Sequence, residues 1–191
     1  MTTYIPNLTL PSGVFNNLPV SILLPIALGT AVGYSTRPKD TKRQYLSWKQ
    51  PPFRPPPWVF GPAWTLLYGL MGYASYRAVH LGTSPLNSPA TIAAAKHGAT
   101  LYSIQLGLNL AWMPLFFGFN RPVEATIDVL ALLGINGYLA YLWGGSVDST
   151  AGCLLVPYVA WLGFASYLSA GTGYLNNWDL STPKDDATKR A

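Results

Sequence analysis

The sequence is poor in charge and in cysteine. Only 10% of its 191 residues are Asp, Glu, Lys or Arg, whereas soluble domains carry about a quarter. That deficit, beside a 50% share of hydrophobic residues, argues against a soluble domain and favours an integral membrane protein. The single cysteine, Cys153, excludes an internal disulfide and a cysteine-based metal cluster. We expect it to be a small buried residue within a helix.

Sequence signatures of common enzyme classes are also missing. There is no Walker phosphate loop, dinucleotide-binding glycine fingerprint, HExxH zinc motif or G-x-S-x-G nucleophile elbow. A secretory signal is not recognisable, since no Lys or Arg precedes the first apolar stretch. We therefore expect a non-enzymatic protein that keeps its first apolar stretch.

What the sequence does contain is apolar stretches of membrane-spanning length. Roughly 20 residues that rise 1.5 Å each cross a hydrocarbon core. Five stretches near or above that length predict an all-α integral membrane protein, a five-helix bundle: residues 18–34, 58–79, 90 or 97 to 119, 123–143 and 150–175. Residues 1–17 and 177–191 are expected to be polar tails on a membrane domain of residues 18–176.

Positive charge is divided unevenly between the two ends of these stretches. Residues 36–57 carry six Lys and Arg, residue 121 adds one and the C-terminal tail adds three, which makes ten on one side. The other side has only Arg77 and Lys96. Because cytosolic loops are enriched in Lys and Arg, we predict that the basic loop and the C-terminus face the cytosol. Topology then accounts for the positive charge, and no nucleic-acid partner is expected.

The basic loop between the first two stretches ends in a dense group of prolines at positions 51, 52, 55, 56 and 57. Proline fixes φ near −65° and interrupts a helix, so this part of the loop is predicted to be stiff and non-helical. It continues directly into an aromatic stretch in which only Arg77 is charged. A stiff cover joined to an aromatic membrane helix predicts an apolar pocket beneath the cover.

Aromatic side chains recur at helical spacing in three of the stretches. The stripes are Trp64, Tyr68, Met71 and Ser75; Gln105, Asn109, Trp112 and Phe116; and Trp161, Ala165, Leu168 and Thr172. Each stripe alone is more typical of a bundle core than of a binding site. Gln105 and Asn109 change this interpretation, because amides in hydrocarbon must bond a neighbouring helix or line a cavity. Aromatic walls with two amides suit a large planar apolar ligand that has a few polar edges.

Four polar residues each allow two interpretations. His80 and His97 lie near span ends, where they are either interfacial side chains or axial ligands of a haem-like iron. Glu124 and Asp128 lie one turn apart at the start of the fourth span. They are either carboxylates stabilised by the helix dipole or part of an ion or proton path. Asp128 would need a basic partner, for which Arg121 or the basic loop are the candidates.

Several of these segments resemble the signature of the TspO/MBR family, the tryptophan-rich sensory proteins and translocator proteins. They are PPFRPPPWVFGPAWTLLYGLMGYASY, QLGLNLAWMPLFFG, the segment around Asp128 and LLVPYVAWLGFASYL. The resemblance covers about residues 20–175. It implies a five-helix membrane bundle with a cytosolic loop over a pocket, in the mitochondrial outer membrane or an endomembrane. The Gly29-x-x-x-Gly33 spacing and the resemblance together suggest a homodimer.

The resemblance further implies binding of porphyrins or haem, of sterols and other apolar ligands, and contact with membrane lipid. The implied ligand-binding residues are Phe53, Trp58, Trp64, Tyr68, Asn109, Trp112, Trp161, Phe164 and Ala165, and the third-span stripe adds Phe116. No obligatory cofactor or metal site is expected, and porphyrin or haem would be the ligand. Trp64 and Trp161 resemble two tryptophans linked in bacterial relatives to light-dependent porphyrin breakdown, which is the alternative function. The family's sterol pattern is incomplete, because no basic residue follows Tyr174 until Lys184.

Overall fold

The computed structural model describes residues 4–36 and 38–180, and this part of the chain is helical without any strand. Its five long helices are α2 (Leu18–Ser35), α4 (Phe60–Gly82), α5 (Pro89–Met113), α6 (Pro122–Ser146) and α7 (Ser149–Leu175). The shorter ones are η1 (Pro6–Leu8), α1 (Ser12–Phe15), α3 (Pro38–Ser47), η2 (Pro57–Val59) and the π-turn η3 (Pro114–Gly118). The predicted all-α class is confirmed.

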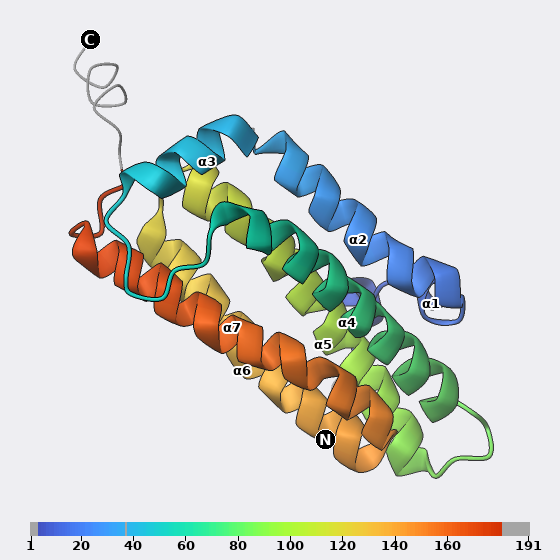
Figure 1. Cartoon of the computed structure of the whole chain (residues 1–191). Helices are drawn as coiled ribbons and strands as arrows, with labels where there is room; N and C mark the ends of the chain where they lie inside the picture. Colours follow the sequence, from blue (N-terminus) through green and yellow to red (C-terminus); the bar gives the residue numbers. More distant parts are fainter. Residues whose placement is uncertain (1–3, 37, 181–191) are drawn as a thin grey trace.

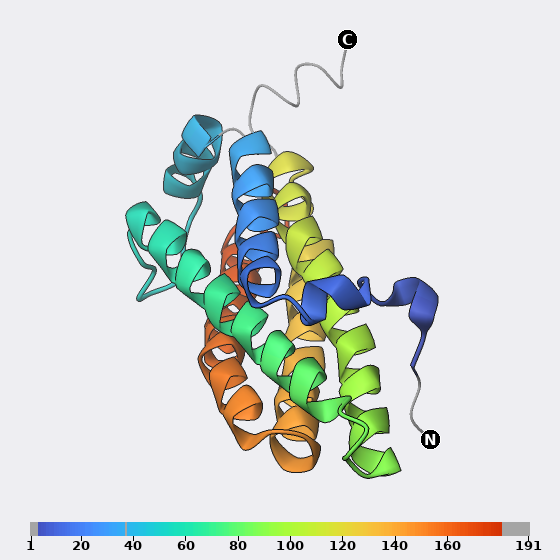
Figure 2. The same cartoon turned by 90° about the vertical axis from the view of Figure 1, so that its right-hand side faces the viewer.

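The long helices form one elongated bundle (Figure 1). Contacts run in a closed order, α2 to α4, α4 to α7, α7 to α6, α6 to α5, and α5 back to α2 and α4. The centre of the bundle is filled by fully buried side chains from four helices, among them Met71, Tyr102, Leu139, Trp143 and Tyr158. α3 lies across one end of the bundle, beside the start of α4 (Figure 2).

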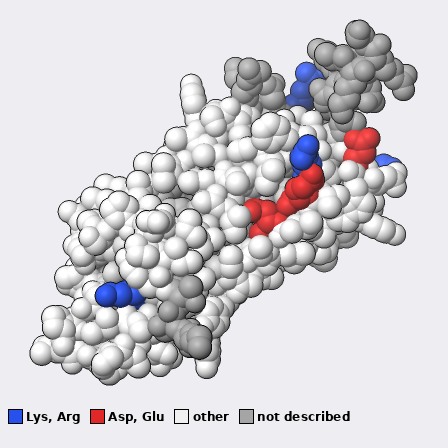
Figure 3. Space-filling model, turned by 180° about the vertical axis from the view of Figure 1, so that it is seen from behind, with Lys and Arg blue, Asp and Glu red and all other residues white. Residues whose placement is uncertain are grey.

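Three helices, α2, α6 and α7, are long and apolar enough to cross a membrane by length and composition. Uncharged residues cover most of the face drawn in Figure 3, and charged residues form only small separate groups on it. α4 and α5 are of similar length, but α4 carries Arg77 and α5 carries the exposed Lys96, and both have polar residues on their buried faces. The membrane character expected from composition is therefore present in the folded chain.

Short local signals explain where the helices begin. Asn17, Ser88 and Asp148 are N-caps whose side chains accept hydrogen bonds from the backbone N–H groups of Val20, Thr91 and Ala151. These bonds satisfy donors that the first turn of a helix leaves unpaired. Proline occupies the first turn of α2, α5 and α6, where its missing N–H costs nothing.

The basic loop contains a helix that was not predicted from the sequence. Residues 48–56 are non-helical, as the prolines predict, but Pro38–Ser47 forms α3. Tyr45 and Trp48 are buried where α3 meets the bundle, and Trp48 stacks on Phe117 with 5.7 Å between ring centroids. A polar ten-residue segment is marginal as an isolated helix, so these tertiary contacts are what stabilise it.

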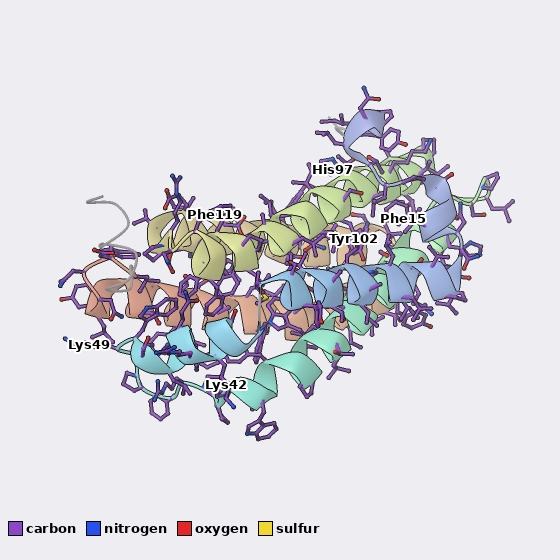
Figure 4. All side chains as sticks on the ribbon, turned by 90° about the horizontal axis from the view of Figure 1, so that it is seen from above. Phe15, Lys42, Lys49, His97, Tyr102 and Phe119 are labelled. Carbon is purple, nitrogen blue, oxygen red and sulfur yellow. The ribbon has the colours of Figure 1, made fainter. Side chains whose placement is uncertain are left out.

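The residues before α2 pack along the bundle. The Ile5 N–H donates to Thr100 Oγ1 at 3.2 Å and the Leu10 N–H donates to Ser103 Oγ at 2.9 Å. Phe15 is buried and meets the ring of Tyr102 edge-on at 5.8 Å (Figure 4). Figure 2 shows this segment crossing α5. It covers one side of the bundle away from α3.

Cys153 is exposed on α7, so the expectation that it is buried is wrong. The buried face of α7 follows Ala151, Leu155, Tyr158 and Leu162 at intervals of three to four residues. Cys153 falls between the first two of these and therefore points to the opposite face of the helix.

Candidate functional site

A cavity of about 510 Å³ lies at the α3 end of the bundle. Cavities that bind small molecules commonly measure about 300–1,000 Å³. All five long helices contribute to its wall, together with α3, η3 and the proline-rich segment. Its aromatic lining residues are Tyr45, Phe60, Trp64, Tyr68, Trp112, Phe116, Phe117 and Trp161. The pocket predicted from the stripes and the cover is therefore present in the structure.

The aromatic rings form two groups on the cavity wall. Trp64 meets Trp161 nearly perpendicularly, with 6.4 Å between ring centroids, and lies 5.4 Å from the ring of Tyr68. On η3 and the end of α5, Trp112 stacks on Phe116 at 5.0 Å with an interplanar angle of 13°. Edge-to-face and stacked pairs of this kind stabilise one another and hold the ring faces in fixed orientations.

A buried hydrogen-bond network closes the inner end of the cavity. The Tyr68 hydroxyl donates to Asn109 Oδ1 at 2.6 Å, and Asn109 Nδ2 donates to the Tyr158 hydroxyl at 2.8 Å. The Tyr158 hydroxyl and Asn136 Nδ2 both donate to Gln105 Oε1 at 3.3 Å. Asn109 lines the cavity, whereas Gln105 lies behind it. Both amides therefore bond neighbouring helices, Asn109 through its oxygen and nitrogen and Gln105 through its oxygen, whereas Gln105 Nε2 has no hydrogen-bond partner.

The proline-rich segment is attached to the end of α7. The Asn176 side chain bonds both backbone groups of Lys49, donating to its carbonyl at 2.8 Å and accepting from its N–H at 3.1 Å. The Tyr167 hydroxyl donates to the Pro52 carbonyl at 3.1 Å. These long-range bonds fix the segment over the α7 side of the cavity.

Tyr45 connects α3 to the same segment. Its hydroxyl donates to the Pro55 carbonyl at 3.0 Å, and its own carbonyl accepts from Gln50 Nε2 at 2.9 Å. Burial raises the pKa of the Tyr45 hydroxyl above its ordinary range, which outweighs the opposing effect of Arg54. Tyr45 thus stays a neutral donor. Gln50 in turn accepts from Thr172 Oγ1 at 3.3 Å on α7.

Close packing of α2 on α4 depends on Gly29. A Cβ atom at this position would overlap the ring of Tyr68. Gly33, one turn further along α2, lines the cavity, and a Cβ atom added there would meet no other atom within 4 Å. Gly29 therefore has a packing role within the chain.

The structure brings together seven of the ten sequence-predicted site residues. The residues that line the cavity are Trp64, Tyr68, Asn109, Trp112, Phe116, Trp161 and Ala165. Phe164 packs on Trp161 at 5.9 Å but does not line the cavity. Phe53 and Trp58 are 90% and 74% exposed and do not line it. Phe53 adopts a left-handed backbone conformation with φ of 63°, which is uncommon for a residue other than glycine.

Sequence reasoning missed the α3 side of the cavity. Thr41, Lys42 and Tyr45 line it from α3, and Phe60 lines it from the start of α4. The available signal was the helical i, i+4, i+7 spacing of Thr41, Tyr45 and Trp48. The density of proline that follows hides that signal, because it marks the whole segment as a loop.

The histidines and acidic residues lie outside the cavity wall. His80 stacks on Tyr76 at 5.0 Å, and His97 meets Tyr138 edge-on at 6.1 Å. Neither histidine lines the cavity, so the geometry does not favour haem ligation by either. Among the residues described, no group of three His, Cys, Asp or Glu could hold a metal ion.

Arg121 pairs with Glu124 at 3.2 Å rather than with Asp128. Asp128 is buried, and its Oδ2 has no hydrogen-bond partner. The candidate pairing of Asp128 with Arg121 is therefore wrong, because an i, i+3 partner on the same exposed helix face is nearer to the guanidinium.

Comparison with known proteins accounts for this arrangement. The TspO/MBR family model matches residues 21–175. The chain is 44% identical to the translocator protein homolog of Schizosaccharomyces pombe over 154 residues, 81% of this chain and 88% of that protein. It is 37% identical to the tryptophan-rich protein TspO of Chlorobaculum tepidum over 153 residues, 78% and 92% of the two chains. It is 40% identical to the translocator protein of Bos taurus over 147 residues, 77% and 82% of the two chains. The chain therefore belongs to the TspO/MBR family of membrane proteins.

Proposed function

We propose that this protein is a membrane receptor or carrier that binds a porphyrin or haem in the cavity at the α3 end. The supporting observation is that Trp64, Trp112 and Trp161 all face one apolar cavity that also contains the amide of Asn109. Flat aromatic faces suit a large planar ring, and the amide suits a polar edge of that ring. Sterols and other apolar ligands are a second class for the same cavity.

In this proposal all five long helices cross the membrane. α4 and α5 have 23 and 25 residues, which at 1.5 Å per residue gives about 34 and 37 Å, more than the hydrocarbon core of about 30 Å. Their lower apolarity fits their position, because each contacts several other long helices. Buried faces in a bundle accept small and polar residues that a lipid-facing surface excludes.

The basic loop, α3 and the C-terminal tail would then face the cytosol, in the mitochondrial outer membrane or an endomembrane. Membrane lipid surrounds the bundle. A homodimer remains part of the proposal, but Gly29 is already occupied by its contact with Tyr68. A dimer contact would therefore use another surface of the bundle.

Porphyrin absorbance tests the binding proposal directly. Purified protein titrated with protoporphyrin should shift the Soret band saturably, with one porphyrin per chain. Trp112→Leu removes a stacked wall of the cavity and should weaken binding about fivefold, since one aromatic stacking contact contributes on the order of 1 kcal/mol. Trp58→Phe changes an exposed tryptophan outside the cavity and should bind normally. Absence of a saturable Soret shift would reject the proposal.

The alternative function is light-dependent porphyrin breakdown. The observation that favours it is the contact of Trp64 with Trp161, whose ring centroids are 6.4 Å apart on the cavity wall. These two side chains would act as redox partners of an excited porphyrin. Illumination in air should then convert bound porphyrin to a new chromophore, and the double substitution Trp64→Phe, Trp161→Phe should prevent conversion but retain binding. Conversion that persists in the double variant would exclude both roles.

A further inference from the structure

We propose that Lys42 is a specificity-determining residue that pairs with an acidic group on the edge of the ligand, so that the cavity selects amphipathic acids over their neutral analogues. The inference rests on the cavity being the ligand site proposed above. Among the described residues that line the cavity, Lys42 is the one with a charged side chain. It lies on α3 beside the start of α4 (Figure 4).

Other polar side chains near Lys42 are neutral and donate hydrogen bonds within the chain. Thr41 Oγ1 donates to the Thr36 carbonyl at 2.8 Å, and the Tyr45 hydroxyl donates to the Pro55 carbonyl at 3.0 Å. Gln50 Nε2 donates to the Tyr45 carbonyl at 2.9 Å. No ion pair of Lys42 occurs within the described part of the chain. Its ammonium group is thus the cationic donor that this rim offers to a ligand.

The inner part of the cavity offers a carboxylate no charged partner. The Tyr68 hydroxyl donates to Asn109 Oδ1, and Asn109 Nδ2 uses one of its two N–H groups in the bond to Tyr158. Trp112 Nε1 has no partner, but a single neutral N–H does not compensate a charge. Burial of an unpaired carboxylate among apolar walls is strongly unfavourable. An amphipathic acid would therefore bind with its apolar body inside and its acidic edge toward Lys42.

This geometry suits lysine well. Its ammonium group is a compact charge on a flexible four-carbon stem, so it can follow an acidic group at the cavity rim. α3 itself is fixed by the buried side chains of Tyr45 and Trp48, so the lysine starts from a defined position. Since Lys42 is exposed, the pair should be screened by salt.

The test compares one porphyrin with and without its acidic groups. Kd is measured for protoporphyrin IX and for its dimethyl ester, in the wild-type protein and in Lys42→Gln, Lys42→Arg and Lys49→Gln. Lys49 is an exposed lysine of the same loop that does not line the cavity and whose hydrogen bonds to Asn176 are made by its backbone (Figure 4). The Kd for the ester is divided by the Kd for the diacid in each variant, and these ratios are compared between variants. Each porphyrin partitions into detergent to the same extent whichever variant is present, so partition does not affect that comparison.

Lys42→Gln should lower the preference for the diacid over the ester about fivefold relative to the wild type, the effect of one exposed ion pair. Lys42→Arg and Lys49→Gln should keep the wild-type ratio. Raising the salt concentration should lower the ratio of the wild type toward that of Lys42→Gln.

Two outcomes would overturn the inference while the proposed function stands. In one, both porphyrins bind the wild type and Lys42→Gln keeps the full preference for the diacid. In the other, Lys49→Gln loses that preference as much as Lys42→Gln, which would assign it to the general charge of the loop. Failure of both porphyrins to bind the wild type would instead reject the proposed function, and the inference with it.

Discussion

The Tyr68 hydroxyl donates a 2.6 Å hydrogen bond to Oδ1 of Asn109 and so joins α4 to α5 at the inner end of the cavity. The same Tyr68 ring fills the space left by Gly29 on α2. One side chain therefore connects three helices and forms part of the cavity wall. Stability and ligand binding should respond together when this ring is altered.

Removal of the Tyr68 hydroxyl should destabilise the bundle. Tyr68→Phe leaves Asn109 Oδ1 buried without its donor, which should cost about 0.5–2 kcal/mol of unfolding free energy. Thermal unfolding in detergent measures the effect as a lowered Tm. Tyr141→Phe removes a hydroxyl from a residue that is 76% exposed and should leave the Tm unchanged. Equal Tm values for the two variants would contradict the structural role of this bond.

A methyl group at Gly29 should displace Tyr68. Gly29→Ala places a Cβ atom into the tyrosine ring, so α2 and α4 must separate or the ring must rotate into the cavity. Either movement should weaken porphyrin binding about tenfold and lower the Tm. Gly137→Ala on α6 is the matched control, because Gly137 does not line the cavity and a Cβ atom there would contact no neighbouring residue within 4 Å. If both variants bind porphyrin equally well, the close approach at Gly29 is not required for the site.

Added volume at Ala165 should compete with the ligand. Ala165 lines the cavity on α7, so the larger side chain of Ala165→Leu would occupy ligand space. We expect affinity for protoporphyrin to fall by about tenfold with little change in Tm, because the side chain enters a cavity rather than a packed core. Ala160→Leu adds the same volume on an exposed face of α7. Titration of both variants distinguishes loss of cavity volume from a general effect of larger residues on this helix.

The ion pair of Asp148 with Arg77 should make stability depend on acid pH. The two side chains meet at 2.8 Å, and the Arg77 guanidinium holds the pKa of the Asp148 carboxyl below its ordinary value near 3.8. Because folding lowers the pKa of Asp148, the ion pair contributes its full stability above the ordinary pKa. This contribution is lost as the pH falls through the lower pKa of the folded state.

Asp148→Asn keeps an N-cap oxygen for α7 but removes this charge. The variant should be less stable than the wild type at pH 7, and the difference in Tm should shrink as the pH falls below about 4. Glu124→Gln, which removes an exposed i, i+3 pair, should show almost no difference at pH 7. A constant difference between Asp148→Asn and the wild type from pH 7 to pH 3 would exclude the proposed linkage.

Membrane sidedness can be measured with single cysteines. In a Cys153→Ser background, Lys49→Cys should react with a membrane-impermeant maleimide added from the cytosolic side, and Lys96→Cys should react only after the membrane is permeabilised. Both lysines are exposed in the structure, so accessibility within the fold does not bias the comparison. The reverse pattern would overturn the orientation inferred from the distribution of Lys and Arg.

The inward-facing tryptophans and amides could be predicted from the sequence because a helix repeats every 3.6 residues. A stripe such as Trp64 and Tyr68, or Asn109 and Trp112, must share one helix face. Where along the stripe a cavity ends could not be predicted. Met71 continues the Trp64 stripe but is fully buried in packed core, since that boundary depends on how five helices converge.

Loop residues were harder to place, since they have no such periodicity. Phe53 is exposed and has a left-handed φ of 63°, which no sequence pattern specified. Lys42 and Tyr45 lie on a helix that depends on tertiary contacts for its stability. Phe15 was assigned to a polar tail because its short segment is dominated by polar neighbours, although its ring is buried against Tyr102.

The buried rings beyond the cavity have a consequence for traffic of the ligand. Phe15, Tyr102, Trp143 and Tyr158 are at most 1% exposed and fill the bundle between the cavity and its far end. Under the proposed function, a ligand in the cavity would therefore leave at the α3 end or between the helices, and not along the bundle axis toward the far end. Passage from one face of the membrane to the other along the bundle axis would first require these four rings to move.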